Sequence, residues 1–155
     1  MKSIGDTRKY STEEIIKGKM LVADWTFLLE VRVVATPKLW LPPPTDYVAL
    51  LVDGSFSRES GEAAAGMILR HHNGSVTFAA YWFIFNCNGA LEAELHAIMQ
   101  GMALALQHSN LPVIVQSDSS EALSSLTGDG LVRSAYGHLV DEIKELMKDR
   151  EFIPQ

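Results

Sequence analysis

The chain has one cysteine, little positive charge and no unbroken apolar segment long enough to cross a membrane. Its single cysteine, Cys87, among 155 residues excludes an internal disulfide and any zinc site built from several cysteines. Cys87 stands where an apolar run gives way to a turn, which favours a packed thiol over a reactive one. A single unpaired cysteine is compatible with a reducing compartment.

Long apolar sequence is also missing. The longest candidate, Met20 to Val34, contains Asp24, Glu30 and Arg32, which excludes a simple transmembrane helix. The first ten residues, MKSIGDTRKY, are too polar for a secretory signal. We therefore expect an intracellular protein, cytoplasmic or nuclear, that is neither secreted nor bound to a membrane.

Positive charge is scarce, above all in the second part of the chain. Overall, 13 Lys and Arg stand against 19 Asp and Glu, for a formal net charge of −6. Residues 47–155 hold six basic and thirteen acidic residues, a net of −7, whereas residues 1–46 hold seven and six. Any nucleic-acid binding by residues 47–155 would have to manage without a basic face.

Proline-rich sequence separates two parts of the chain. Before it, Ser11 and Glu14 have the spacing of a capping box, and the apolar pattern that follows predicts a helix over about residues 12–30. The run Trp40-Leu41-Pro42-Pro43-Pro44 favours extended backbone and predicts a stiff linker. We therefore divide the chain into an N-terminal helical extension with its linker, residues 1–46, and a folded domain, residues 47–155.

The folded domain begins with a pattern of three strands. Tyr47 to Asp53 is apolar enough to predict a buried strand, and Gly54-Ser55 predicts its end. Residues 63–71 and 75–85 predict two further strands, joined by the hairpin signal Asn73-Gly74. A meander of three strands is expected.

Helices and short strands alternate in the remainder. Apolar positions over residues 91–107 have helical spacing, residues 112–116 predict a strand, and Ser117-Asp118-Ser119-Ser120 can cap a following helix. A further amphipathic helix is expected over about residues 139–147, and Phe152 begins what looks like another strand. The order β-β-β-α-β-α-α, with the start of a fifth strand, predicts an α/β fold with a mixed sheet flanked by helices.

Three acidic residues stand at the ends of predicted elements. Asp53 ends the first strand, Glu94 opens the long helix and Asp118 ends the fourth strand. If strands one and four are parallel neighbours, both aspartates emerge at the same edge of the sheet, beside the helix that carries Glu94. Clustered carboxylates repel each other unless a cation neutralises them, so this pattern predicts a site for a hard metal ion, with Mg²⁺ the first candidate.

Each acid also has an ordinary structural explanation. Asp53 could open a turn, Asp118 could cap a helix, and Glu94 could complement the helix dipole. Helical periodicity does not decide which of Glu92 and Glu94 belongs to this site, because the two residues lie on opposite edges of the apolar stripe of the predicted helix. The convergence of three acids, rather than any one of them, favours a metal site.

Aromatic side chains gather in the third predicted strand. Tyr81, Trp82, Phe83 and Phe85 could stack on nucleotides, but in an alternating strand packing in the core is the favoured role. The five histidines show neither HxxxH nor HExxH spacing, so they are interpreted as surface or hydrogen-bonded residues rather than metal ligands.

Four segments occur in an order and approximate spacing known from other proteins. They are Leu51-Val52-Asp53-Gly54-Ser55-Phe56, preceded by Trp40-Leu41-Pro42-Pro43-Pro44, then Ala65-Gly66-Met67-Ile68-Leu69-Arg70, Glu92-Ala93-Glu94-Leu95-His96-Ala97 and Val115-Gln116-Ser117-Asp118-Ser119. Together they resemble the type 1 ribonuclease H fold, and specifically the reverse-transcriptase-like ribonuclease H domain common in plant and retroelement-derived proteins. The resemblance covers about residues 40–155.

The resemblance implies roles for the three acids. Asp53 matches the first-strand metal ligand, Glu94 the acid of the Ala-Glu-Leu element, and Asp118 the fourth-strand ligand, so Glu94 is selected over Glu92. Similar proteins are nucleases that use two Mg²⁺ ions to cut the RNA strand of an RNA–DNA hybrid, with Mn²⁺ as the alternative metal. One ion would activate the attacking water and the other would stabilise the leaving oxygen, so the three metal ligands are also the catalytic residues.

The chain as given ends before the family pattern does. After Phe152-Ile153-Pro154-Gln155, that pattern continues to a closing helix with a fourth acid, and Asp141, Glu142, Glu145 and Asp149 are interpreted as a solvated face rather than as substitutes. We therefore expect weaker metal binding and lower stability. Three alternatives follow: an active hybrid ribonuclease, a non-catalytic nucleic-acid or protein interaction remnant derived from a retroelement, and a truncated gene model of a longer active protein. No feature predicts an oligomeric state.

Overall fold

A computed structural model describes residues 40–128 and 135–155. The helix expected over residues 12–30 lies outside the described residues, and the division of the chain at residue 46 remains a prediction. Within the described ranges, no helix combines the length and the apolar character needed to cross a membrane.

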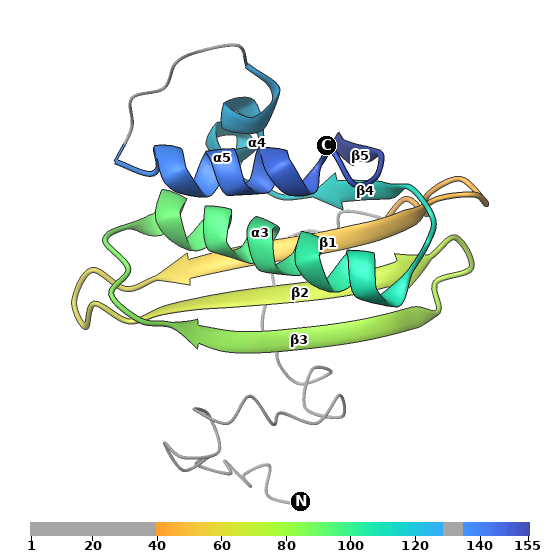
Figure 1. Cartoon of the computed structure of the whole chain (residues 1–155). Coiled ribbons are helices and arrows are strands. Elements are labelled where there is room, and N and C mark those ends of the chain that lie inside the picture. Colours follow the sequence, from red (N-terminus) through yellow and green to blue (C-terminus); the bar gives the residue numbers. More distant parts are fainter. Residues whose placement is uncertain (1–39, 129–134) are drawn as a thin grey trace, which may run out of the picture.

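Five strands form one mixed sheet in the order β3-β2-β1-β4-β5 (Figure 1). β1 (Val48–Phe56), β2 (Ala63–His71) and β3 (Val76–Ile84) form the predicted antiparallel meander. β4 (Val113–Gln116) pairs parallel with β1, and β5 (Phe152–Pro154) pairs parallel with β4. The predicted α/β fold and order of elements are confirmed, including the fifth strand.

The three helices of the described chain lie on one face of this sheet (Figure 1). α3 (Ala90–His108) crosses β1 and β2, and α5 (Gly137–Leu146) packs beside it. α4 (Ser120–Thr127) contacts both of these helices and β5. The opposite face of the sheet carries no helix among the described residues.

The core fills the space between α3 and the sheet, because alternate side chains of each strand point to the helices. A Cβ added to Gly101 of α3 would lie 3.0 Å from Val52 and 3.2 Å from Leu50, so β1 and α3 are in close contact. Each large side chain buried in this layer contributes about 1.5–3 kcal/mol of hydrophobic stabilisation. The members exposed by less than 2% include Val48, Leu50, Met67, Leu69, Leu95, Ile98 and Met102.

β1 is longer than the sequence predicts. Gly54-Ser55 is expected to end the strand, but Gly54 pairs with Ala65 and Phe56 pairs with Ala63. Pairing with β2 therefore overrides the local preference of glycine and serine for turns. Asp53 lies inside the strand, which contradicts both the prediction that it ends the strand and the alternative that it opens a turn.

The predicted hairpin between β2 and β3 is confirmed. Gly74 adopts the left-handed region with φ 83°, and Asn73 Oδ1 accepts hydrogen bonds from Ser75 N at 3.0 Å and Ser75 Oγ at 2.7 Å. The N–H of Gly74 also donates to the His71 carbonyl at 2.9 Å, so residues 72–74 form a three-residue loop with glycine in the left-handed position rather than a two-residue turn. The hairpin places β3 at the edge of the sheet, next to β2.

Candidate metal centre

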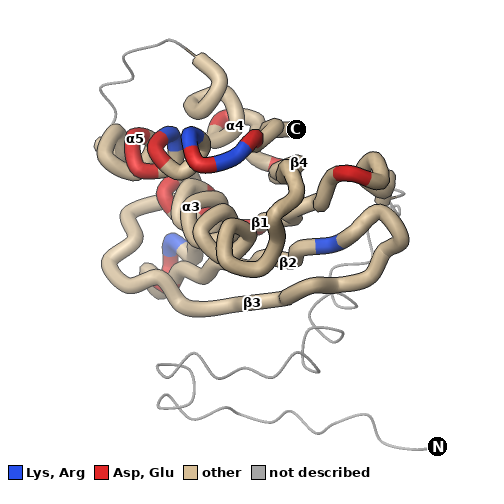
Figure 2. The backbone as a smooth tube through the Cα atoms, turned by 45° about the vertical axis from the view of Figure 1, so that its right-hand side comes forward, with Lys and Arg blue, Asp and Glu red and all other residues tan. Residues whose placement is uncertain are grey.

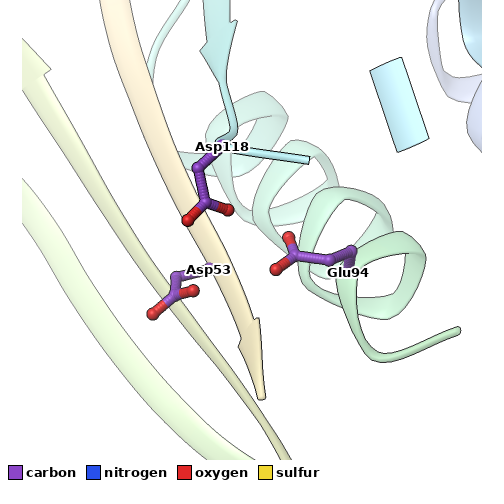
Figure 3. Close-up of side chains that lie close together, drawn as sticks. All are labelled: Asp53, Glu94 and Asp118. Carbon is purple, nitrogen blue, oxygen red and sulfur yellow. The ribbon is translucent and has the colours of Figure 1, made fainter. Parts of the chain in front are cut away.

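The three acids singled out in the sequence meet at one rim of the sheet (Figure 3). One carboxylate oxygen from each of Asp53, Glu94 and Asp118 lies within 4.8 Å of the other two. Glu94 is buried, Asp53 is half-buried and Asp118 is exposed, so the cluster reaches solvent on the side of Asp118. No other group of three such ligands occurs in the part of the chain that the structure describes.

The parallel pairing of β1 and β4 brings the two aspartates together. Leu51 pairs with Gln116, and the two strands run in the same direction. Asp53 lies two residues beyond Leu51 and Asp118 lies two residues beyond Gln116, so both are carried to the same rim. α3 begins at this rim and supplies Glu94 in its second turn.

Gly54 allows α3 to approach β1 at the cluster. A Cβ on Gly54 would lie 2.4 Å from the backbone nitrogen of Glu94 and 2.5 Å from the carbonyl carbon of Ala93. Both atoms belong to the helix backbone, so no rotation of a side chain could make room. The backbone N–H of Gly54 also donates a hydrogen bond to the Glu94 carboxylate. Gly54 therefore fixes Glu94 beside the strand that carries Asp53.

Ser117 connects Glu94 to the end of β4. Its Oγ donates to Glu94 Oε2 at 3.3 Å and accepts from Ser119 N at 3.1 Å. Ser119 Oγ in turn accepts from Ala122 N at 3.2 Å and is the N-cap of α4. Because Ser119 caps the helix, the alternative that Asp118 serves as the cap is wrong.

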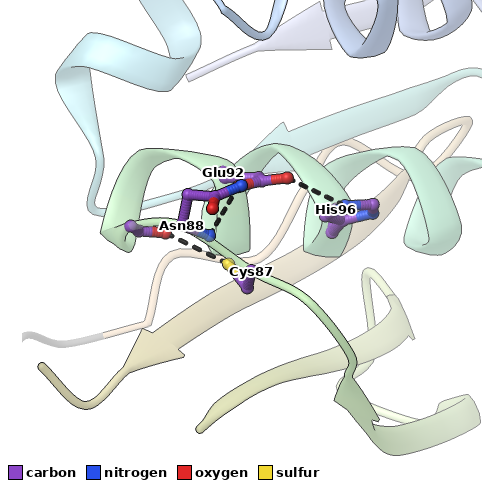
Figure 4. Close-up of polar contacts among 5 residues, drawn as sticks. Cys87, Asn88, Glu92 and His96 are labelled. Carbon is purple, nitrogen blue, oxygen red and sulfur yellow. Dashed lines mark hydrogen bonds and ion pairs between the residues drawn. The ribbon is translucent and has the colours of Figure 1, made fainter. Parts of the chain in front are cut away.

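Glu92 belongs to a separate set of contacts (Figure 4). Asn88 donates to Glu92 Oε2 from its backbone N at 2.7 Å and from Nδ2 at 3.1 Å, and His96 Nε2 lies 3.9 Å from Glu92 Oε1. Glu92 thus holds the turn that leads into α3 and is not a member of the cluster. Of the two glutamates that periodicity leaves open, Glu94 is the one that lies at the rim.

The other groups considered in the sequence lie away from the cluster. Cys87 is buried and donates its Sγ–H to the Gly89 carbonyl at 3.3 Å, which confirms the packed thiol. On and after α5, acidic residues alternate with lysines and an arginine (Figure 2). The predicted solvated face is confirmed, since all four of its acids are exposed: Asp141, Glu142, Glu145 and Asp149.

The environment of Glu94 disfavours its charged form. The pKa of Glu94 is raised from 4.5 to about 7, mainly by burial and in addition by the nearby carboxylates of Asp118 and Asp53. The hydrogen bonds from Gly54 and Ser117 act in the opposite direction. A bound cation would compensate both the burial and the repulsion. Carboxylate oxygens are the ligands that Mg²⁺ and Mn²⁺ prefer, so the donor set fits a hard divalent ion.

We expect Glu94→Gln to stabilise the metal-free protein above neutral pH. The pKa of Glu94 is higher in the folded than in the unfolded chain, so its ionisation lowers the free energy of unfolding as pH rises through about 4.5 to 7. Glutamine removes this cost. Urea unfolding in EDTA should show a gain of about 1–3 kcal/mol at about pH 8 that shrinks toward zero near pH 4.5. The exposed Glu142→Gln is the control, and an equal gain at both pH values would refute the explanation by ionisation.

Comparisons with known proteins place the chain in a family. The family model described as reverse transcriptase-like matches residues 51–153. No curated protein sequence matches the chain. Because the family model covers well over half of the 155 residues, the family assignment holds for the chain as a whole.

Several solved structures share the fold. Ribonuclease H1 of Halobacterium salinarum is 19% identical with a TM-score of 0.63, over 70% of this chain and 82% of that chain. The N-terminal ribonuclease H domain of a Mycobacterium tuberculosis protein, solved as a fusion with maltose-binding protein, is 19% identical with a TM-score of 0.62, over 70% and 78%. LC11 ribonuclease H1 in complex with an RNA/DNA hybrid is 16% identical with a TM-score of 0.61, over 70% and 83%. The chain belongs to the reverse transcriptase-like family and has a ribonuclease H-like fold.

Proposed function

We propose that the chain binds divalent metal, Mg²⁺ first and Mn²⁺ as the alternative, and hydrolyses the RNA strand of an RNA–DNA hybrid. The observation that carries this proposal is the rim cluster, in which carboxylates of Asp53, Glu94 and Asp118 approach within 4.8 Å of one another. A structure with the same fold, LC11 ribonuclease H1, has been solved with such a hybrid bound. Family and geometry thus support the same substrate class.

The residues of the chain would hold and orient the metal rather than react themselves. Asp53 is fixed on a paired strand, and Glu94 is fixed between Gly54 and Ser117. Asp118, the exposed member, faces the solvent from which a phosphate would arrive. When bound, a divalent cation would neutralise the cluster, activate water for attack on the phosphodiester and stabilise the leaving oxygen. No side-chain nucleophile is required.

The charge of the domain limits how it can hold a nucleic acid. With six basic and thirteen acidic residues over 47–155, long-range attraction to phosphates is weak. Contact would therefore rest on the metal and on recognition of the minor groove and the 2′-hydroxyl groups.

A non-catalytic ribonuclease H-like module, a retroelement-derived remnant that binds a nucleic acid or a protein, is the second candidate. The acidic balance of residues 47–155 favours it, because such a surface suits a basic protein partner better than a polyanion. The two candidates have the same fold, but only the first catalyses hydrolysis.

Cleavage of a labelled hybrid distinguishes them. The RNA strand is labelled, annealed to DNA and incubated with the purified chain in Mg²⁺, in Mn²⁺ and in EDTA. We expect shorter RNA products with either metal and no cleavage in EDTA. Labelled double-stranded DNA of the same sequence should stay intact under all three conditions. If no enzyme concentration cleaves the hybrid, the non-catalytic candidate is the better one.

A further inference from the structure

Aromatic side chains line the face of the sheet that the helices leave uncovered. Along β3, Trp82 and Ile84 pack into the core, so the alternating Tyr81 and Phe83 lie on the opposite face. Both are half-buried, and Phe85, just after the strand, is 72% exposed. The prediction that these aromatics pack in the core is confirmed for Trp82 and wrong for Tyr81, Phe83 and Phe85.

The strand register places this face next to the metal centre. Asp53 pairs with Gly66, and Gly66 pairs with Tyr81, so the three form a row across β1, β2 and β3. The neighbouring row on the same face consists of Ser55, Ala64 and Phe83. With adjacent strands about 4.8 Å apart, the backbones of Asp53 and Tyr81 are separated by about 10 Å. Gly66, the middle residue of the row, has no side chain, so a flat ligand could lie across it between Asp53 and Tyr81.

A cavity of about 290 Å³ opens on this second row. Its lining includes Ser55, Ser57, Glu62, Ala64, Tyr81 and Phe83. The rings of Tyr81 and Phe83 meet edge to face, with centroids 5.7 Å apart and planes inclined by 73°. In that geometry the two rings do not cover each other's faces completely, so a planar group can stack on an aromatic surface.

The chemistry of the lining excludes phosphate and suits a neutral planar group. Among the described residues, no lysine or arginine lines the cavity, and the carboxylate of Glu62 would repel an anion. Burial, and then the charge of Glu62, raise the pKa of Tyr81, so its hydroxyl stays protonated. The hydroxyls of Ser55 and Ser57 and the Glu62 carboxylate can exchange hydrogen bonds with the polar edge of a base.

We propose that this cavity is a subsite for an unpaired nucleobase, next to the phosphate that the metal centre would hold. A base within a duplex is stacked and exposes only its edges, so a base that stacks on Phe83 or Tyr81 has to be unpaired. The proposal rests on the proposed function, since a metal ion held by Asp53 would define where the bound RNA strand lies. It adds to the proposed function a preference for hybrids that carry a single-stranded RNA segment beside the cleavage site.

Binding is measured by fluorescence anisotropy with Ca²⁺ in place of Mg²⁺ to limit turnover. The probes are a labelled blunt RNA–DNA hybrid and the same hybrid with a short single-stranded RNA overhang. We expect the wild-type chain to bind the overhang hybrid about tenfold more tightly, and Phe83→Ala to lose this preference. Phe83→Leu, which keeps an apolar side chain without the ring, should lose it as well, whereas Phe83→Trp should retain it.

Phe85→Ala is the matched control, because Phe85 is an exposed phenylalanine outside the cavity. It should bind both hybrids as the wild type does. Equal affinity of the wild type for the two hybrids, or a preference that survives in both Phe83→Ala and Phe83→Leu, would overturn the subsite. Cleavage of the blunt hybrid tests the proposed function separately. If neither hybrid is bound nor cleaved, the proposed function fails and the subsite falls with it.

Discussion

Asp53→Asn should abolish cleavage of the RNA–DNA hybrid while the chain remains folded. The substitution keeps the shape of the side chain but removes its charge and one of its two possible metal-binding oxygens. Loss of partners that merely orient metal ligands typically lowers metal affinity or activity by 10- to 100-fold, so loss of a ligand itself should lower the cleavage rate by about 100-fold or more. Repulsion within the cluster also falls, so the melting temperature should not decrease.

Asp141→Asn is the control for this experiment. It makes the same change of charge at an exposed position on α5, away from the cluster. Its cleavage rate should equal that of the wild type at every Mg²⁺ concentration. An Asp53→Asn chain that cleaves within about tenfold of the wild-type rate would remove Asp53 from the set of ligands.

Gly54→Ala should lower both the stability of the fold and its affinity for metal. The new Cβ would lie 2.4–2.7 Å from backbone atoms of Ala93 and Glu94, so α3 has to move away from β1. We expect a loss of about 3 kcal/mol or more in the free energy of unfolding, at the upper end of the range for overpacked cores. The movement also displaces Glu94 from Asp53, so calorimetric titration with Mn²⁺ should show weaker binding than in the wild type.

The same substitution at Gly89 is the comparison. There the nearest atom to an added Cβ would be the Tyr136 hydroxyl oxygen at 3.6 Å, an ordinary contact, and the backbone is extended. Gly89→Ala should therefore cost about 1 kcal/mol or less, the usual effect of alanine at a helix N-cap. If urea unfolding gave Gly54→Ala and Gly89→Ala the same midpoint, the close packing of α3 on β1 would be wrong.

Most of the fold could be predicted because its signals are local. The apolar run of β1 and the helical spacing of α3 report directly which side chains are buried. The hairpin loop is specified locally by Gly74, which adopts a positive φ, and by Asn73, whose side chain accepts a hydrogen bond from Ser75. The end of β1 could not be predicted in this way, because pairing of Gly54 with Ala65 on another strand decides it.

The candidate site was predictable in part. Asp53 and Asp118 could be found from their places near the ends of parallel strands, but the rotation of α3, which brings Glu94 rather than Glu92 to the rim, depends on its packing against Gly54. Ser117 gave no local signal, because its bond to Glu94 joins residues 23 positions apart. The role of Gly54 was missed, because a glycine marks a close approach of backbones only where it lies inside a strand, and the sequence predicts that Gly54 ends the strand.

A crystal structure with Mn²⁺, recorded at the manganese absorption edge, tests the metal centre most directly. We expect an anomalous peak between Asp53, Glu94 and Asp118, close enough to their carboxylate oxygens for direct coordination. The peak should be absent from crystals of Asp53→Asn grown under the same conditions. A wild-type crystal with no manganese at this rim, or with manganese only on the exposed acids of α5, would contradict the assignment.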